Sequence, residues 1–221
     1  MKKHILCFGD SNTHGYFPCV SDGVDGKTFR FNENERYTCL LQKALGEDYL
    51  VIEEGLSGRT TVFDDPFFDG LSGLRYLFPC LMSHEPVSLL IIMLGTNDTK
   101  ARFSVGAPEI GMGMARLVKA AQVTDCWGPG GKPNILVIAP PPILEGRNAV
   151  ENDTMGPGCV EKSQKLAAIY AAHCEALGVH FLNASDAGCV FNDNDFMHLT
   201  KDSHRLLAEK LARMIPSILT E

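Results

Sequence analysis

The chain has 221 residues, a formal net charge of −7, 45% hydrophobic residues and 21% charged residues. This length and composition predict one globular domain over residues 1–221. The negative charge argues against a nucleic-acid partner or an anionic membrane surface. No apolar run reaches the roughly 20 residues of a membrane helix, and the run behind the basic start stops at Phe8, too early for a signal peptide. We therefore expect a cytoplasmic protein.

Five short apolar runs have the length and bounds of buried strands, at residues 4–8, 49–52, 89–94, 135–138 and 179–182. Apolar residues recur at helical spacing between and after them, over residues 37–45, 71–83, 110–121, 166–177 and from about 200 onward. Residues 143–160 show no period, which predicts a long functional loop. Strands that alternate with helices predict a parallel sheet covered by helices on both faces.

Eight cysteines are spread along the chain, and none forms a C-x-x-C pair. Without an export signal we expect reduced thiols rather than disulfides. Cys80 and His84 stand four residues apart, which could mimic a pair of metal ligands, but two ligands do not make a site.

Small polar turns follow three of the predicted strands. Gly9-Asp10-Ser11-Asn12 follows the first strand, Gly58 lies in a turn after the second, and Asn97 follows the third. Because the carboxyl ends of parallel strands meet at one edge, the three turns are predicted to form one site. The backbone N–H groups of Ser11 and Gly58 and the side-chain amide of Asn97 could together bind an oxyanion.

Ser11 is a candidate nucleophile, which would need a base and a group that orients the base. His198 stands three residues after Asp195 and just before the last helix, so the carboxylate could fold back on the imidazole. The alternatives are that Ser11 is an ordinary turn or cap residue and that His198 is a solvent-exposed residue at a helix start. Arg59 is expected to pair with Asp64 or Asp65.

Four blocks in this order resemble the SGNH hydrolases, also called GDSL-type lipases and esterases: Gly9-Asp-Ser-Asn12, Gly58 within 56–61, Gly95-Thr-Asn-Asp98, and Asp195-x-x-His198-Leu199. The resemblance implies a flavodoxin-like three-layer α/β/α sandwich with a five-stranded parallel sheet. It implies that Ser11 is the nucleophile, His198 the base and Asp195 its partner. It also implies an oxyanion hole of Ser11, Gly58 and Asn97, and no metal or organic cofactor.

Residues 5–11, 51–61 and 90–100 are similar to the small bacterial arylesterases and acyltransferases of that family. This branch implies hydrolysis of short acyl esters, acyl transfer in some members, and a homo-oligomer. Asn12 stands where the usual motif has leucine, and we expect it to affect pocket polarity. His14 is a second candidate lining residue of the acyl pocket. His204, on the last helix, is expected at the surface.

The sequence thus predicts a serine esterase for small acetyl or aryl esters. A carbohydrate O-deacetylase and an acyltransferase with the same residues are the first alternatives. A non-catalytic binding protein on a hydrolase scaffold is a further alternative, which the five intact candidate positions disfavour.

Overall fold

The computed structural model describes residues 1–18, 29–128, 130–145 and 154–220. Five strands form one parallel sheet in the order β2-β1-β3-β4-β5. Their bounds are Lys3–Gly9 for β1, Tyr49–Gly55 for β2, Val87–Met93 for β3, Ile135–Ala139 for β4 and His180–Asn183 for β5. The five predicted strands are therefore confirmed, each within a few residues of its expected position.

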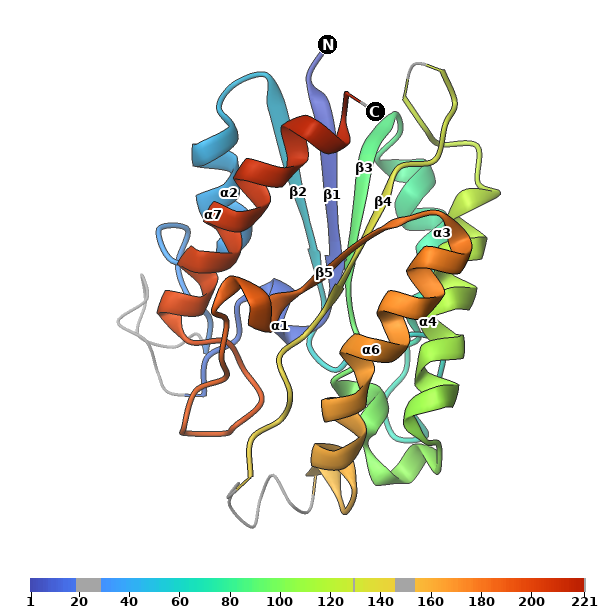
Figure 1. Cartoon of the computed structure of the whole chain (residues 1–221), viewed down its shortest axis with the longest axis vertical. Coiled ribbons are helices and arrows are strands. Elements are labelled where there is room, and N and C mark those ends of the chain that lie inside the picture. The colour runs from blue at the N-terminus through green and yellow to red at the C-terminus, as the bar shows by residue number, and fades with distance from the viewer. Residues whose placement is uncertain (19–28, 129, 146–153, 221) are drawn as a thin grey trace.

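Helices cover both faces of the sheet, as Figure 1 shows. One face packs against α2 (Tyr37–Leu45) and α7 (Lys201–Ile218). The other packs against α3 (Gly73–Ser83), α4 (Ala107–Gln122) and α6 (Cys159–Leu177). The arrangement is the predicted three-layer α/β/α sandwich.

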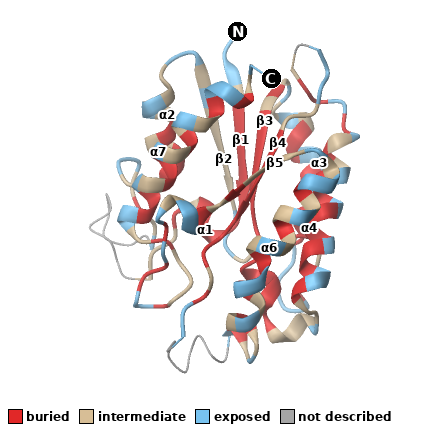
Figure 2. Cartoon of the chain, in the orientation of Figure 1, coloured by how far each residue is buried: buried red, intermediate tan, exposed pale blue. Residues whose placement is uncertain are grey.

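The inner strand β1, which pairs with β2 and β3, shows why this sequence forms a covered sheet. Ile5, Leu6, Cys7 and Phe8 are fully buried. Side chains alternate along a strand, so Leu6 and Phe8 pack under α3, α4 and α6 while Ile5 and Cys7 pack under α2 and α7. Figure 2 shows the same burial along β3 and β4. A continuous apolar run is what a strand covered on both faces requires.

The structure departs from the sequence predictions in the loops. A one-turn helix, α1 (Ser11–His14), follows β1 where a polar loop was expected. Helix α6 begins at Cys159, so the predicted loop over 143–160 ends slightly earlier than expected. Part of that loop, residues 146–153, lies outside the described residues. Short 3-10 turns also appear: η1 (Asn97–Thr99), η2 (Ala101–Phe103) and η3 (Ala184–Ala187).

The strand order determines where a ligand can sit. The chain adds β2 on one side of β1 and then β3 on the other, so the connections diverge between β1 and β3. In open α/β sheets, ligands bind at the carboxyl ends of the strands beside such a point. The turns after β1 and β3 carry Ser11 and Asn97, which places both candidates at this crevice.

Two further findings concern the described residues only. None of their helices combines the length and apolar character needed to cross a bilayer. Their seven cysteines are free thiols, and all but Cys39 are buried.

Candidate active site

Ser11 is the first residue of α1, directly beyond the carboxyl end of β1. The Asp10 carboxylate caps this turn by accepting the Asn12 N–H at 2.9 Å, and Gly15 ends it at φ +84°. Gly9 allows the turn to fold tightly, because a Cβ there would lie 2.0 Å from Thr13 Oγ1. The backbone therefore holds the Ser11 hydroxyl in one place at the edge of the sheet.

His198 and Asp195 form a hydrogen-bonded line with Ser11. The imidazole Nε2 lies 2.8 Å from Ser11 Oγ, and Nδ1 lies 2.6 Å from Asp195 Oδ2. The ring of Tyr16 packs on the imidazole with centroids 4.5 Å apart. With Nδ1–H donating to the carboxylate, Nε2 is left as an acceptor for the serine proton. The arrangement has the geometry of a nucleophile, a base and an orienting acid.

Asp195 is held as a carboxylate by several donors. Its Oδ1 accepts the backbone N–H groups of Met197 and His198, both at 3.2 Å, and the Asn192 side-chain amide at 3.1 Å. Burial acts to raise the pKa of Asp195, but the hydrogen bond and charge of His198 and the backbone donors outweigh it, so the pKa is lowered. A carboxylate that stays ionised can stabilise an imidazolium.

Asn12 has a different place from the one expected. We expected it to line the substrate pocket, but its side chain is 1% exposed and lies under residues 197–199. Its Oδ1 accepts the Leu199 N–H at 2.9 Å, and its Nδ2 donates to the Met197 carbonyl at 3.3 Å. Asn12, the residue after Ser11, is thus hydrogen-bonded to the backbone on both sides of His198. A departure from the usual motif was visible in the sequence, but its bonding partners were not.

The three N–H donors expected to form an oxyanion hole belong to Ser11, Gly58 and Asn97, and that role remains a prediction. Gly58 has φ +88°, a conformation that glycine adopts without strain, and no described residue accepts its N–H. Asn97 Nδ2 lies 3.2 Å from the Arg59 carbonyl and 3.4 Å from Asp10 Oδ2, so both contacts are at the long end of the hydrogen-bond range. The Ser11 N–H at the start of α1 is likewise unpartnered among the described residues.

A buried carboxylate ties two of these donor turns together. Asp98 follows Asn97 and accepts the Thr61 N–H at 2.9 Å, along with the Thr61 hydroxyl. Burial raises the pKa of Asp98 to about 6, despite the bonds from Thr61 that lower it. Neighbouring positions in the sequence do not indicate this pairing, because only the fold brings residues 61 and 98 together.

Two other candidates lie away from the hydroxyl of Ser11. His14 ends α1, and its ring contacts the backbone of Gly55 at the end of β2; burial and two nearby arginines lower its pKa. Its role in an acyl pocket remains a prediction. The expected ion pair of Arg59 with Asp64 or Asp65 is wrong. Its guanidinium donates to the Gly9 carbonyl at 2.8 Å and stacks on the Phe8 ring.

His204 is buried, so the expectation of a surface position is also wrong. Its Nδ1 accepts the Tyr37 N–H at 3.2 Å, and its ring stacks on that of Tyr37 and meets the Phe31 ring edge-on. Burial lowers the pKa of His204 to about 3. Helical spacing from Leu207 and Leu211 could have indicated this inward position, since 204 lies on the same face.

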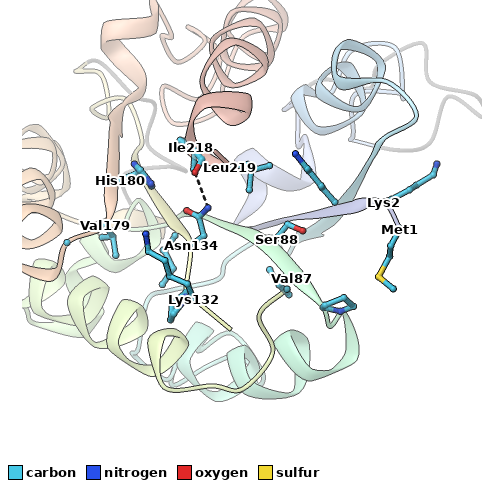
Figure 3. A pocket seen from close by; sticks show the side chains of 16 residues that line it. Met1, Lys2, Val87, Ser88, Lys132, Asn134, Val179, His180, Ile218 and Leu219 are labelled. Carbon is cyan, nitrogen blue, oxygen red and sulfur yellow. Dashed lines mark hydrogen bonds between the residues drawn. The ribbon is translucent and has the colours of Figure 1, made fainter. Parts of the chain in front are cut away.

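A cavity of about 560 Å³ lies at the opposite edge of the sheet, between the amino ends of the strands. Figure 3 shows Lys132 and His180 at this cavity, and Asn134 donating to the Ile218 carbonyl at 3.3 Å. The carboxyl edge carries Ser11, so this cavity belongs to another part of the molecule.

A parallel sheet that carries this Ser–His–Asp line and its donors at the carboxyl edge defines an α/β ester hydrolase. The sequence model of the GDSL-like lipase/acylhydrolase family matches residues 7–206. The chain belongs to this family, and it is accordingly a carboxylic ester hydrolase.

Solved structures similar to this chain include esterases of two kinds. The native aryl esterase of M. smegmatis is 40% identical, with a TM-score of 0.87 over 98% of this chain and 99% of its own. The carbohydrate acetylesterase Est24 from Sinorhizobium meliloti is 37% identical, with the same TM-score and coverage. A second carbohydrate acetylesterase family member from that organism is 34% identical, with a TM-score of 0.86 over 99% and 100%. A search of curated protein sequences found no match.

Proposed function

We propose that this chain is a serine esterase that hydrolyses small acyl esters, such as acetyl and aryl esters, through an acyl-enzyme. The observation that carries the proposal is the line from Asp195 through His198 to Ser11, with contacts of 2.6 and 2.8 Å. Both distances are short enough for direct proton transfer. Such esters are the small-molecule partner that the proposal requires.

In the first half-reaction, Ser11 Oγ attacks the ester carbonyl while His198 Nε2 takes the serine proton. The carbonyl oxygen becomes an oxyanion, which accepts the N–H groups of Ser11 and Gly58 and the Asn97 amide. The intermediate collapses, the C–O bond to the alcohol breaks, and His198 returns the proton to the leaving oxygen. Asp195 stabilises the imidazolium throughout.

In the second half-reaction, water attacks the acyl group on Ser11 and gives its proton to His198. The bond to Ser11 Oγ then breaks, and the serine recovers that proton from the imidazole. The carboxylic acid leaves, and the enzyme is restored. An alcohol in place of water would give a new ester, so acyl transfer uses the same steps.

Replacing Ser11 with alanine tests the proposal. Loss of the nucleophile is expected to lower kcat for p-nitrophenyl acetate by at least about 10³-fold. A fluorophosphonate probe should label the wild type and not Ser11→Ala. Ser83→Ala, an exposed serine at the end of α3, is the matched control and should keep full activity. Substantial hydrolysis by pure Ser11→Ala would refute the assignment, and an unlabelled wild type would favour a non-catalytic binding protein.

A carbohydrate O-deacetylase is the second candidate, favoured by the two carbohydrate acetylesterases among the similar structures. Acetate release from acetylated sugars, compared with release from aryl acetates, distinguishes the two substrates. Adding an alcohol and analysing the products measures acyl transfer against hydrolysis.

We further propose a homo-oligomer, because several large apolar side chains are exposed. Phe67, Phe68 and Phe78 expose more than half of their surface. Exposed apolar patches mark contact surfaces. Light scattering after size-exclusion chromatography should give a mass above the 24.1 kDa of one chain. A monomer at micromolar concentration would contradict this. The cytoplasmic location stays a prediction.

A further inference from the structure

Three side chains of metal-binding type meet between β2 and α3, outside the Ser11 site. Cys80 lies in the last turns of α3 and His84 follows the helix as its cap, so the two side chains are one turn apart on one face. Glu54 comes from β2, one residue before the strand ends. One ligand atom from each residue lies within 4.8 Å of the other two. The fold thus adds a third ligand to the pair at 80 and 84 seen in the sequence.

Two of the three side chains already interact. Glu54 Oε1 lies 2.8 Å from His84 Nε2, so a shared proton occupies the place where an ion would bind both atoms. A small movement of the side chains would open this contact to the spacing of tetrahedral ligands. One thiolate, one imidazole and one carboxylate form the mixed set that zinc and related ions prefer.

We propose that Glu54, Cys80 and His84 bind a divalent cation of the zinc class, with a water as fourth ligand. On binding, Cys80 gives its thiol proton to solvent, and His84 carries its remaining proton on Nδ1 while Nε2 binds the ion. Glu54 changes from accepting the imidazole N–H to binding the ion. No redox change or further reactant is involved.

Exposure and charge are compatible with such an ion. The side chains of Glu54 and His84 are 18% and 29% exposed, so an ion can reach them from solvent, while Cys80 forms the buried end of the site. The glutamate and the thiolate supply two negative charges. Arg59, whose guanidinium stacks on Tyr76 one turn before Cys80, is the opposing charge nearby. The positive charge of Arg59 lowers the affinity for a cation. The two negative ligands still balance the two positive charges of the ion.

Cobalt titration of the metal-stripped full chain tests the site. We expect one Co²⁺ per chain, with the visible bands of a tetrahedral ion and a near-ultraviolet thiolate-to-cobalt band. Calorimetric titration with ZnCl₂ should give a dissociation constant of about 1 μM or lower. Zinc should displace the cobalt and raise the melting temperature.

Variants decide whether these residues are the ligands. Cys80→Ser should abolish the thiolate band, and His84→Gln and Glu54→Gln should each weaken zinc binding at least about 10-fold. Cys174→Ser, a buried cysteine on α6 that packs on the same face of the sheet, is the control and should change neither. Glu54→Gln and His84→Gln keep the test valid if Cys80→Ser does not fold.

The proposal is overturned if the wild type binds no zinc at 100 times the expected dissociation constant of about 1 μM. It is also overturned if the cobalt spectrum lacks the thiolate band, or if all three ligand variants bind as the wild type does. The Glu54–His84 pair would then be a hydrogen bond beside a buried thiol. None of these outcomes depends on the esterase reaction.

Discussion

Replacing Asn12 with alanine should disturb the position of His198 while leaving the catalytic side chains themselves in place. The Asn12 amide joins the residue after the nucleophile to both neighbours of His198. In Asn12→Ala, Ser11, His198 and Asp195 are all still present, and Asp195 keeps its bonds to its own loop. Only the connection between the two segments is lost.

The expected size of the effect follows from the two hydrogen bonds. The Leu199 N–H is buried and would lose its acceptor, which costs about 1–3 kcal/mol. The longer bond to the half-buried Met197 carbonyl contributes less, so the free energy of unfolding should fall by about 2–4 kcal/mol. A shift of about 1 Å in a catalytic group costs about 10²-fold in rate. We therefore expect kcat to fall about 10²-fold, with KM within about twofold.

Ester hydrolysis and urea denaturation measure the two effects separately. Asn134→Ala is the matched control, because Asn134 also gives a 3.3 Å bond to a backbone carbonyl but lies at the opposite edge of the sheet. It should lower stability and leave kcat unchanged. If Asn12→Ala unfolded more easily but kept the wild-type kcat, the amide would be a stabilising contact only and our argument for positioning would fail.

Two more predictions concern a turn and a buried imidazole. Gly58→Ala places a side chain at φ +88° with its Cβ 3.0 Å from Leu71, so unfolding free energy should drop by about 1–2 kcal/mol. Relief of the strain would turn the N–H away, lowering kcat about 10–100-fold in ester assays. His204 is neutral in the fold because burial lowers its pKa to about 3 from 6.5, so unfolding takes up a proton between these values. The stability that depends on neutral His204 is fully present above pH 6.5, and it is lost as the pH falls from 6.5 toward 3. From pH 7 to 5, wild type should lose about 2 kcal/mol more stability than His204→Gln, measured by urea unfolding.

Each of these two predictions, for Gly58→Ala and for His204→Gln, can be contradicted by a specific result. An alanine at 58 that leaves both kcat and stability unchanged would mean that the turn tolerates a side chain and that its N–H is not a donor in the reaction. Parallel pH–stability curves for the wild type and His204→Gln would mean that the imidazole titrates alike in the folded and unfolded chain.

The sequence predicts the fold well because its signals are local. Four apolar residues stopped by Gly9 suffice to predict β1, and alternation with helical periods predicts a parallel sheet. Ser11, Gly58 and Asn97 could be grouped because each follows a strand, and parallel strands share an edge. What the sequence missed depends on contacts between distant segments. Asn12 meets Leu199 only after the fold has closed, and nothing near 12 in the chain indicates that partner.

The buried and surface positions of single polar residues were hardest to predict. His204 is inward because one face of α7 packs against α2, and a stacked aromatic environment accommodates a neutral ring. Arg59 finds backbone carbonyls and aromatic faces rather than the acidic residues near it in sequence. In both cases tertiary packing selects partners that charge and spacing do not indicate.

The separation of 187 positions between Ser11 and His198 has a consequence for how the chain is made. A ribosome would release the hydroxyl well before the imidazole, so in the interval a growing polypeptide does not yet have the imidazole that takes the serine proton. Docking of α7 against α2 then delivers the imidazole. Esterase activity should therefore appear only when the segment with His198 has folded against the segment with Ser11. The rate at which a chromogenic ester begins to be hydrolysed would then measure that folding step.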